Sequence, residues 1–413
     1  MNITIPFAQT EVKITVDDRS VKDVVYPNRV LIEDEIQTIQ SGLNHPVSSP
    51  PFGDFLTDGK DVLFVVNDHT RPTPTAKILD VLEKTINKIH VQFLVATGSH
   101  RAPTKKELNK IFGRHFERFQ KSIQIHDARD QNAMVPMGVS SRGTRIEINR
   151  LVVDAQKIVI IGSVEPHYYA GFTGGRKSIM PGVASYLTIE QSHRFAMEEN
   201  AQVLTLKDNP VHEDMEETIR IFRKKEIFSI MTVLDHCEQI YHVTCGDLSA
   251  SFLEATQKAM EVYSVPVKEK AGVVVAVVGS PLDINLYQSH KAMEQARLAL
   301  KDNGILILVS SCWDGIGPST FVDILSGSKN SQEALQKIDR SYQLGFHKVK
   351  RIVQMLDQFE IWAVTQLDPN LIQSLFMRPF GSIQQAVDEA ISARSEEQVL
   401  FLMNAGVTVP RIS

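Results

Sequence analysis

Short runs of apolar residues, each followed by a polar loop and then by an amphipathic stretch, recur along this chain. Continuous runs rich in Val, Ile and Leu occur at 61–67 (DVLFVVN), 90–97 (HVQFLVAT) and 157–162 (KIVIIG). Such runs are typical of strands that are buried on both faces of a parallel sheet. The stretches TAKILDVLEKTI and KKELNKIFG, which follow the first two runs, have the apolar spacing of helices. This alternation predicts an α/β fold with largely parallel sheets flanked by helices.

A second series of the same kind begins with AGVVVAVVG at 271–279 and continues with SHKAMEQARLAL and GILILVS. The segment PVKEK (266–270) precedes it and is proline-led and charged, as a hinge between domains would be. The sequence therefore predicts an N-terminal catalytic and cofactor-tethering domain over 1–268 and a C-terminal α/β domain over 269–396. The last segment, 397–413, contains the apolar run VLFLM, and we expect it to pack back on the N-terminal domain.

Composition changes this picture little but excludes several classes of protein. The chain has 413 residues, of which 43% are hydrophobic and 23% charged, and its net charge is −5. Basic residues are scattered rather than clustered, so we expect no nucleic-acid partner. The apolar runs are far shorter than the roughly 20 residues of a membrane helix, and the N-terminus lacks the pattern of a signal peptide. With three cysteines that form no CxxC pair, these features predict a cytoplasmic protein without a membrane anchor.

Polar side chains follow three successive predicted strands at the points where the strands end. They are Asp68 and Arg71 after the first strand, His100 after the second and His167 after the third. In open α/β sheets, ligands bind beyond the carboxyl ends of the strands, and the loops there carry side chains that are free to act. The sequence therefore predicts that these four side chains converge on one cleft.

Each of these side chains can have either a role in catalysis or binding, or a purely structural one. Histidine titrates near neutral pH, so His100 and His167 can act as acid and base on two sides of a substrate, or be simple polar loop residues. Arg71 can bind a carboxylate through two parallel hydrogen bonds, or form a surface ion pair of about 0–1 kcal/mol. Asp68 can orient a histidine or hold Arg71, or cap a turn.

The segment GFTGGRKS differs from the phosphate-loop pattern GxxxxGK[ST] because Arg176 stands in the place of the last glycine. The insertion SVEPHYYA separates it from the preceding strand, and Pro181 follows too soon for the Lys-Ser pair to open a helix. We therefore reject a phosphate loop. What remains is a loop in which Gly174 and Gly175 let the backbone approach a ligand and position Lys177. This lysine is a nucleophile or covalent tether, or else a solvated surface residue.

Two further segments carry candidate binding residues. His193 lies in the predicted helix TIEQSHRFAMEE without a second histidine four residues later, so a metal there needs its other ligands from elsewhere. It can equally be a partly buried helix histidine. The segment NLYQSHK (285–291) begins a helix in which Gln288 and Lys291 can face one side. A lysine at a helix N-terminus suits an anion, but a solvent-facing first turn is the open alternative.

Four motifs of this chain resemble, in the same order, motifs of the lactate racemase family. The run SVEPHYYAGFTGGRKSIMPGVASYLTI (163–189) closely resembles the core signature of the family. The other three motifs are DHTRPTP (68–74), TGSHR (97–101) and NLYQSHK (285–291). The resemblance spans most of the chain and includes the layout in two domains, which implies an active site in the cleft between them.

The resemblance also implies a cofactor and a role for each candidate residue. The cofactor is a nickel-pincer nucleotide, Ni(II) pyridinium-3-thioamide-5-thiocarboxylic acid mononucleotide, which cofactor biosynthesis proteins supply. Lys177 matches the lysine that joins this cofactor through a thioamide bond, and His193 matches the histidine that completes the square-planar set around nickel. His100 and His167 match the catalytic pair, and Asp68 matches an aspartate that supports the site. Gly174, Gly175 and Arg176 match the loop that binds the cofactor. The residues that match positions around the substrate are Arg71, Tyr287, Gln288 and Lys291.

The implied activity is that of a racemase or epimerase, which inverts C2 of a 2-hydroxyacid by reversible hydride transfer to the cofactor. Arg71 would hold the planar 2-keto acid while the two histidines move the hydroxyl proton. The nearest alternative is a sugar-acid C2 epimerase with the same cofactor. Alternatives of other classes are a phosphotransferase that binds a nucleotide through GFTGGRKS and a non-catalytic protein that stores or senses the cofactor.

Overall fold

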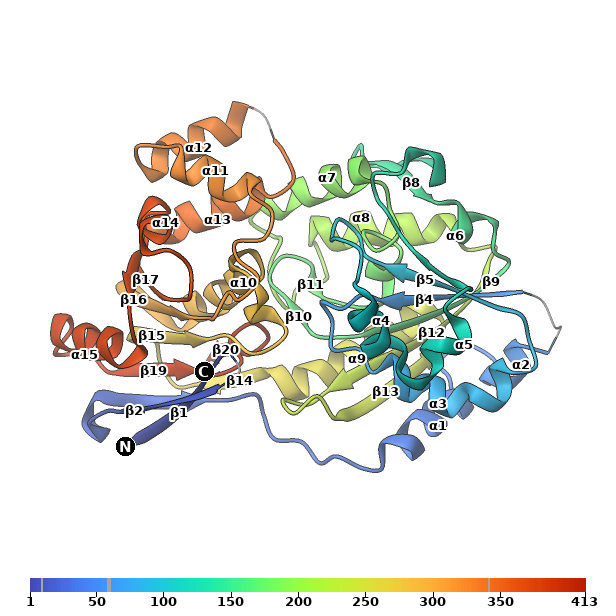
Figure 1. The fold of residues 1–413 in the computed structure, drawn as a ribbon, viewed down its shortest axis with the longest axis horizontal. Helices are drawn as coiled ribbons and strands as arrows, with labels where there is room; N and C mark the ends of the chain where they lie inside the picture. The colour runs from blue at the N-terminus through green and yellow to red at the C-terminus, as the bar shows by residue number, and fades with distance from the viewer. Residues whose placement is uncertain (9, 58–60, 341) are drawn as a thin grey trace. The chain divides into compact units, whose positions relative to one another are not determined.

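The structure is a computed structural model that describes residues 1–413 except 9, 58–60 and 341. It divides into two compact units (Figure 1). Unit 1 combines residues 1–28 with residues 263–413, and unit 2 consists of residues 29–262. Each unit contains a six-stranded sheet with helices packed on it, so the predicted fold class, α/β with largely parallel sheets, is confirmed.

The sheet of unit 2 carries the first three predicted strands. Its order is β13 (Ile240–Gly246), β12 (Glu226–Leu234), β9 (Lys157–Ser163), β4 (Val62–Asn67), β5 (Val91–Ala96) and β6 (Ile123–Ile125). Neighbouring strands run parallel except for β12 and β13. The strands β4, β5 and β9 are buried along nearly their whole length, which explains why they read as continuous apolar runs.

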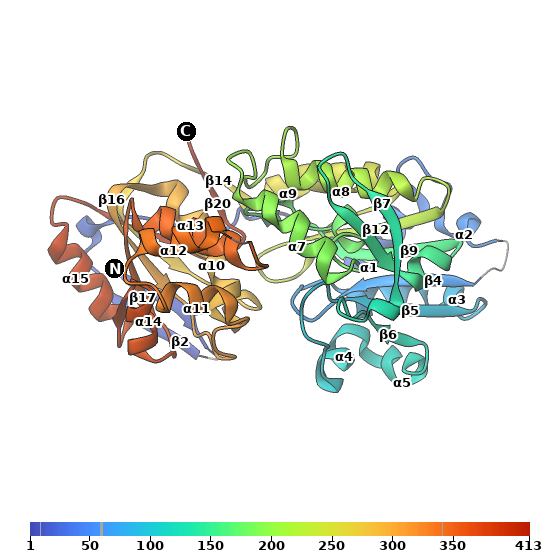
Figure 2. The same cartoon turned by 90° about the horizontal axis from the view of Figure 1, so that it is seen from above.

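Helices cover both faces of this sheet. One face forms a hydrophobic core with α1 (Glu35–Asn44), α2 (Phe52–Phe55), α3 (Thr75–Ile86), α4 (Lys105–Phe112) and α5 (Phe116–Phe119). The ring of Phe93 on β5 contacts that of Phe112 on α4 edge-on, with centroids 5.2 Å apart, and this contact fixes α4 beside its strand. On the opposite side lie α8 (Pro210–Ile221) and α9 (Leu248–Tyr263) (Figure 2). Smaller elements of unit 2 are β7 (Met134–Val139), β8 (Arg145–Asn149), α6 (Arg150–Asp154), β10 (Pro166–His167), β11 (Gly171–Phe172) and α7 (Tyr186–Arg194).

The sheet of unit 1 is parallel throughout. Its order is β18 (Arg378–Phe380), β17 (Glu360–Val364), β16 (Leu300–Val309), β15 (Ala271–Val277), β19 (Val399–Leu402) and β3 (Val21–Val25). One face forms a core with α15 (Ile383–Ala393) and the hairpin of β1 (Asn2–Phe7) and β2 (Thr10–Thr15). The remaining elements are β14 (Ser264–Val267), α10 (Leu286–Ala296), α11 (Thr320–Ser326), α12 (Ser331–Arg340), α13 (Phe346–Leu356), α14 (Pro369–Ser374) and β20 (Val409–Ile412).

The two ends of the chain differ from the prediction. Residues 1–28, which we assigned to the N-terminal domain 1–268, belong to unit 1, because β3 extends its sheet by pairing with β19. The segment 397–413 pairs with two strands from the predicted range 1–268, β3 and β14, but these strands belong to unit 1 and not to unit 2, which carries most of the candidate site residues. Strand β19 also pairs with β15, which belongs to the same unit. The division at the other end of unit 2 falls between Val262 and Tyr263, where we predicted a boundary near residue 268.

The topology of unit 2 places the candidate residues at the carboxyl ends of neighbouring strands. Strand β4 lies between β5 and β9 and runs parallel to both, so the three carboxyl ends are neighbours. The loops that follow these ends carry Asp68, His100 and His167. Among the described residues, no helix combines the length and the apolar character that a membrane-spanning segment requires.

Candidate active site

Asp68 and His100 form a hydrogen-bonded pair at the carboxyl ends of β4 and β5. Nδ1 of His100 lies 2.7 Å from Oδ2 of Asp68, which is buried. The other carboxylate oxygen accepts hydrogen bonds from the backbone N–H and the hydroxyl of Thr70. Burial favours the neutral acid, but His100 and Thr70 outweigh it and lower the pKa of Asp68 to about 2. The ionised carboxylate therefore orients the imidazole and leaves Nε2 as the atom that can exchange a proton.

Arg71 follows the same strand and faces a carboxylate that sequence reasoning did not single out. Its Nη1 lies 3.8 Å from Oε2 of Glu165, which is an ion-pair distance longer than a hydrogen bond. The hydroxyl of Ser163 donates to Glu165 at 2.7 Å and also accepts from Thr73 at 3.0 Å. These bonds connect the loop after β4 with the end of β9. The motif VEPHYY contains Glu165, but only the adjacency of β4 and β9 reveals its partner.

Tyr169 brings three of the predicted residues together. Its ring centroid lies 4.4 Å from that of His167 and 5.4 Å from that of His193, and Nζ of Lys177 lies 5.3 Å from it. The short strands β10 and β11 pair antiparallel and hold His167 next to the turn of this hairpin. We did not predict a role for Tyr169, although its position two residues after His167 in a Tyr-Tyr pair was a visible signal.

Glycines set the path of the loop that carries Lys177. Gly174 has a φ of +75°, and a Cβ atom there would lie 2.6 Å from Cγ2 of Val164, so a side chain would not fit. The following residues Gly175–Ser178 form a single 3-10 turn rather than the start of an α-helix, which agrees with our rejection of a phosphate loop. Beyond this turn, Gly182 donates to the carbonyl of Lys177 and accepts from Gly98, two residues before His100. These bonds tie the lysine loop to the histidine loop.

The two cations of this loop point in different directions. Lys177 is partly buried near Arg71, whereas Arg176 is 1% exposed, donates to the carbonyl of Ala170 and lies over the ring of Phe252 on α9. Burial lowers the pKa of Arg176 to about 9 against the opposing effect of Glu216. The structure thus places Arg176 against α9, and its role in cofactor binding stays a prediction.

Lys177 is expected to lose its proton at a lower pH than an ordinary lysine. Burial, followed by the charges of Arg71 and Arg176, holds its pKa well below the usual range, because each disfavours the ammonium form. Trace acetylation of the apoprotein with acetic anhydride at about pH 6 to 11, read by peptide mass spectrometry, should give a midpoint below about 10.4 for Lys177. The variant Arg71→Gln should raise this midpoint. A midpoint near that of ordinary lysines would contradict the effect expected from burial and from the neighbouring arginines.

The spacing of potential metal ligands decides where unit 2 could bind a metal ion. Among the described residues, the one group of three or more side chains with metal-ligand geometry is Asp235, His236 and Cys237, in the turn between β12 and β13. His193, on α7, is not part of it. Within the described part of the chain, a metal at His193 would therefore need a non-protein ligand for part of its coordination, where the sequence left open whether its other ligands come from the fold or from a cofactor.

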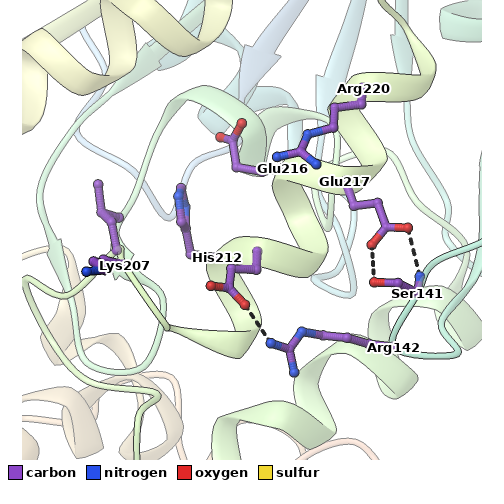
Figure 3. A pocket seen from close by; sticks show the side chains of 9 residues that line it. Ser141, Arg142, Lys207, His212, Glu216, Glu217 and Arg220 are labelled. Atoms are coloured by element: carbon purple, nitrogen blue, oxygen red, sulfur yellow. Dashed lines mark hydrogen bonds and ion pairs between the residues drawn. The ribbon is translucent and has the colours of Figure 1, made fainter.

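A pocket of about 450 Å³ lies beside α8, and none of the residues predicted for the site lines it (Figure 3). Charged side chains of both signs line it, among them the ion pair of Arg142 with Glu213, and Ser141 donates two hydrogen bonds to Glu217. His212 also lines it, and burial followed by the charge of Arg176 lowers the pKa of His212 to about 3. This pairing of opposite charges selects no class of ligand.

The remaining predicted residues lie on α10 of unit 1. Gln288 and Lys291 are buried, with 6% and 9% exposure, so a solvent-facing first turn is wrong. The carboxamide oxygen of Asn285 caps this helix by accepting from the backbone N–H of Gln288. Lys348 of α13 donates to the carbonyl of Tyr287 at 2.8 Å and lies over its ring. Substrate binding by Tyr287, Gln288 and Lys291 stays a prediction.

The fold and these side chains define a two-unit α/β enzyme with an aspartate–histidine pair, a second histidine and a lysine of lowered pKa. Models of the lactate racemase N-terminal and C-terminal domains match residues 7–205 and 265–410. The lactate racemase from Thermoanaerobacterium thermosaccharolyticum is 29% identical over 99% of this chain and 98% of its own. The lactate racemase from Lactiplantibacillus plantarum is 27% identical over 98% of this chain and 99% of its own. The chain belongs to the lactate racemase family, and as such it is an isomerase.

Solved structures agree with this family. The lactate racemase apoprotein from T. thermosaccharolyticum matches with a TM-score of 0.89 and 28% identity, over 100% of both chains. A protein from Thermotoga maritima matches with a TM-score of 0.72 over 93% of this chain and 100% of its own, but at 17% identity this likeness concerns the fold alone.

Proposed function

We propose that this enzyme inverts C2 of a 2-hydroxyacid, with lactate as the first substrate to test, and that it works with a nickel-pincer nucleotide. The observation that carries the proposal is the convergence of His167, His193 and Lys177 on the ring of Tyr169, in the same unit as the Asp68–His100 pair. The two lactate racemases that match along nearly the whole chain support the choice of substrate.

The two histidines would supply the acid and the base. Inversion at C2 through a planar 2-keto acid requires the hydroxyl proton to leave from one enantiomer and return to the other. His100 would take or give this proton at Nε2, because Asp68 holds Nδ1. His167 would do the same for the opposite enantiomer. Arg71 would bind the substrate carboxylate, since its contact with Glu165 at 3.8 Å leaves guanidinium N–H groups for a stronger acceptor.

The residues present fit the proposed cofactor. Lys177, with a pKa well below the usual range, has the nucleophilic amine that a covalent tether needs. His193 and Lys177 contact the same tyrosine ring, so a small planar group bound to the lysine can reach the imidazole. His193 would provide one nickel ligand and leave the others to the nucleotide. When bound, the cofactor supplies the acceptor and donor of hydride at C2.

An isotope experiment tests this function. Enzyme from a host that makes the cofactor is incubated in ordinary water with one enantiomer of lactate that carries deuterium at C2. Chiral chromatography with mass spectrometry should find the other enantiomer with the deuterium retained, because hydride transfer does not exchange with solvent. Loss of deuterium would point to proton abstraction and overturn the hydride mechanism. If lactate is not racemised, a panel of larger 2-hydroxyacids and aldonates separates the epimerase alternative from absence of the activity.

A further inference from the structure

The carboxylate of Glu107 contacts His69 and Arg101, the residues that directly follow Asp68 and His100 in the sequence. Glu107 lies in the first turn of α4 and accepts two parallel hydrogen bonds, each 2.8 Å long, from the guanidinium of Arg101. Its Oε1 also lies 3.6 Å from Nε2 of His69. Arg101 directly follows His100, and His69 directly follows Asp68. The same side chain therefore connects the loop after β4 with the loop after β5.

The helix N-terminus fixes Glu107 in this place. Thr104 and Glu107 form a complete capping box, in which the hydroxyl of Thr104 accepts from the backbone of Glu107 and the carboxylate accepts from the backbone of Thr104 at 2.7 Å. Hydrogen bonding from Arg101, followed by that from Thr104 and the charge of His69, outweighs burial and lowers the pKa of Glu107 to about 2. The carboxylate is thus ionised at neutral pH. Arg101 and Thr104 hold it by hydrogen bonds, and Nε2 of His69 lies at the longer distance of 3.6 Å.

We propose that Glu107 is a positioning residue that keeps Asp68 and His100 within hydrogen-bond distance by binding His69 and Arg101. The sheet fixes where β4 and β5 end, but it does not fix the side-chain directions in the loops that follow. A bidentate arginine bond sets both distance and orientation, so it defines the course of the loop that carries His100. This inference rests on the proposed function in one respect, the role of His100 as acid and base.

The first test is Glu107→Gln in the holoenzyme. Glutamine can also occupy this place in a capping box, so the helix keeps its cap while the charge and one of the two acceptors for Arg101 are lost. We expect kcat to fall about 10- to 100-fold, because a small misplacement of a reacting group has that effect. KM should change little, since Arg71 is untouched. Glu117→Gln, an exposed carboxylate on α5, is the matched control and should leave kcat unchanged.

Two further measurements separate positioning from a loss of structure. Thr104→Val removes the hydroxyl of the cap but leaves the Glu107 carboxylate, so it should lower stability without affecting the Asp68–His100 bond. Glu107→Gln should shift or broaden the downfield NMR resonance of the hydrogen-bonded His100 ring proton, and Thr104→Val should not. In an Asp68→Asn background, Glu107→Gln should lower kcat no further, because the bond on which it acts is already altered.

These outcomes decide the proposal independently of the function. An unchanged ring-proton resonance in Glu107→Gln, or a loss of kcat that multiplies with that of Asp68→Asn, would overturn the positioning role. If the resonance shifts as expected but the wild-type holoenzyme inverts no 2-hydroxyacid, the positioning role stands and the proposed function fails.

Discussion

His100→Ala and His167→Ala are each expected to lower the rate of racemisation by about 10²- to 10⁴-fold, the range that a positioned acid or base contributes. Each turnover uses both side chains, because the hydroxyl proton leaves through one and returns through the other. Both directions should therefore slow in each variant, whichever enantiomer is supplied. The measurement is the initial rate from each pure enantiomer, followed by chiral chromatography on enzyme with equal cofactor content.

The double variant makes this prediction sharper. If the two histidines act as one unit, His100→Ala with His167→Ala should be about as slow as the slower single variant rather than slower by the product of both effects. His90→Ala is the matched control. This exposed histidine pairs with Asp61, which directly precedes β4, and so lies at the amino ends of the strands and not at their carboxyl ends. Retention of more than about a tenth of the rate by either single variant would rule out that histidine as acid or base.

Much of unit 2 could be predicted because a parallel sheet buried on both faces leaves a clear pattern. The strands expected at 61–67, 90–97 and 157–162 appear as β4, β5 and β9 with ends that differ by one residue. The helix expected over TAKILDVLEKTI appears as α3 with the same bounds. Once the strands are known to be parallel, the meeting of the loops that follow them needs no further information.

What the sequence could not reveal depends on partners that are distant along the chain. Strand β3 (VKDVV) is an edge strand that is largely unburied, so it lacks the apolar run of an interior strand. Glu165 and Glu107 are ordinary charged residues until the fold places them beside Arg71 and His69. The burial of Gln288 and Lys291 could not be predicted either, because a polar first turn of a helix usually faces solvent. Packing between elements, not local pattern, decides these cases.

His193→Ala is expected to remove nickel from the enzyme while leaving the organic part of the cofactor attached. The proposal gives the tether to Lys177 and the metal ligand to His193, and both contact Tyr169 from separate elements. Wild-type protein without a polyhistidine tag, from a host that makes the cofactor, should contain about one nickel per chain in a square-planar set. Elemental analysis measures the metal, and intact-protein mass spectrometry measures the attached nucleotide.

Two controls give each outcome a single meaning. Lys177→Ala should lose both the nickel and the added mass, whereas His193→Ala should lose the nickel alone, so the pair separates tethering from metal binding. The side chains of Asp235, His236 and Cys237 lie close enough to hold an adventitious ion, so His236→Ala with Cys237→Ser sets the background and should keep the full nickel content. Nickel that disappears with these two residues and persists in His193→Ala would place the metal in the turn between β12 and β13. A nickel-free wild-type enzyme that still racemises its substrate would overturn the nickel-pincer proposal and leave the two histidines to act without a metal.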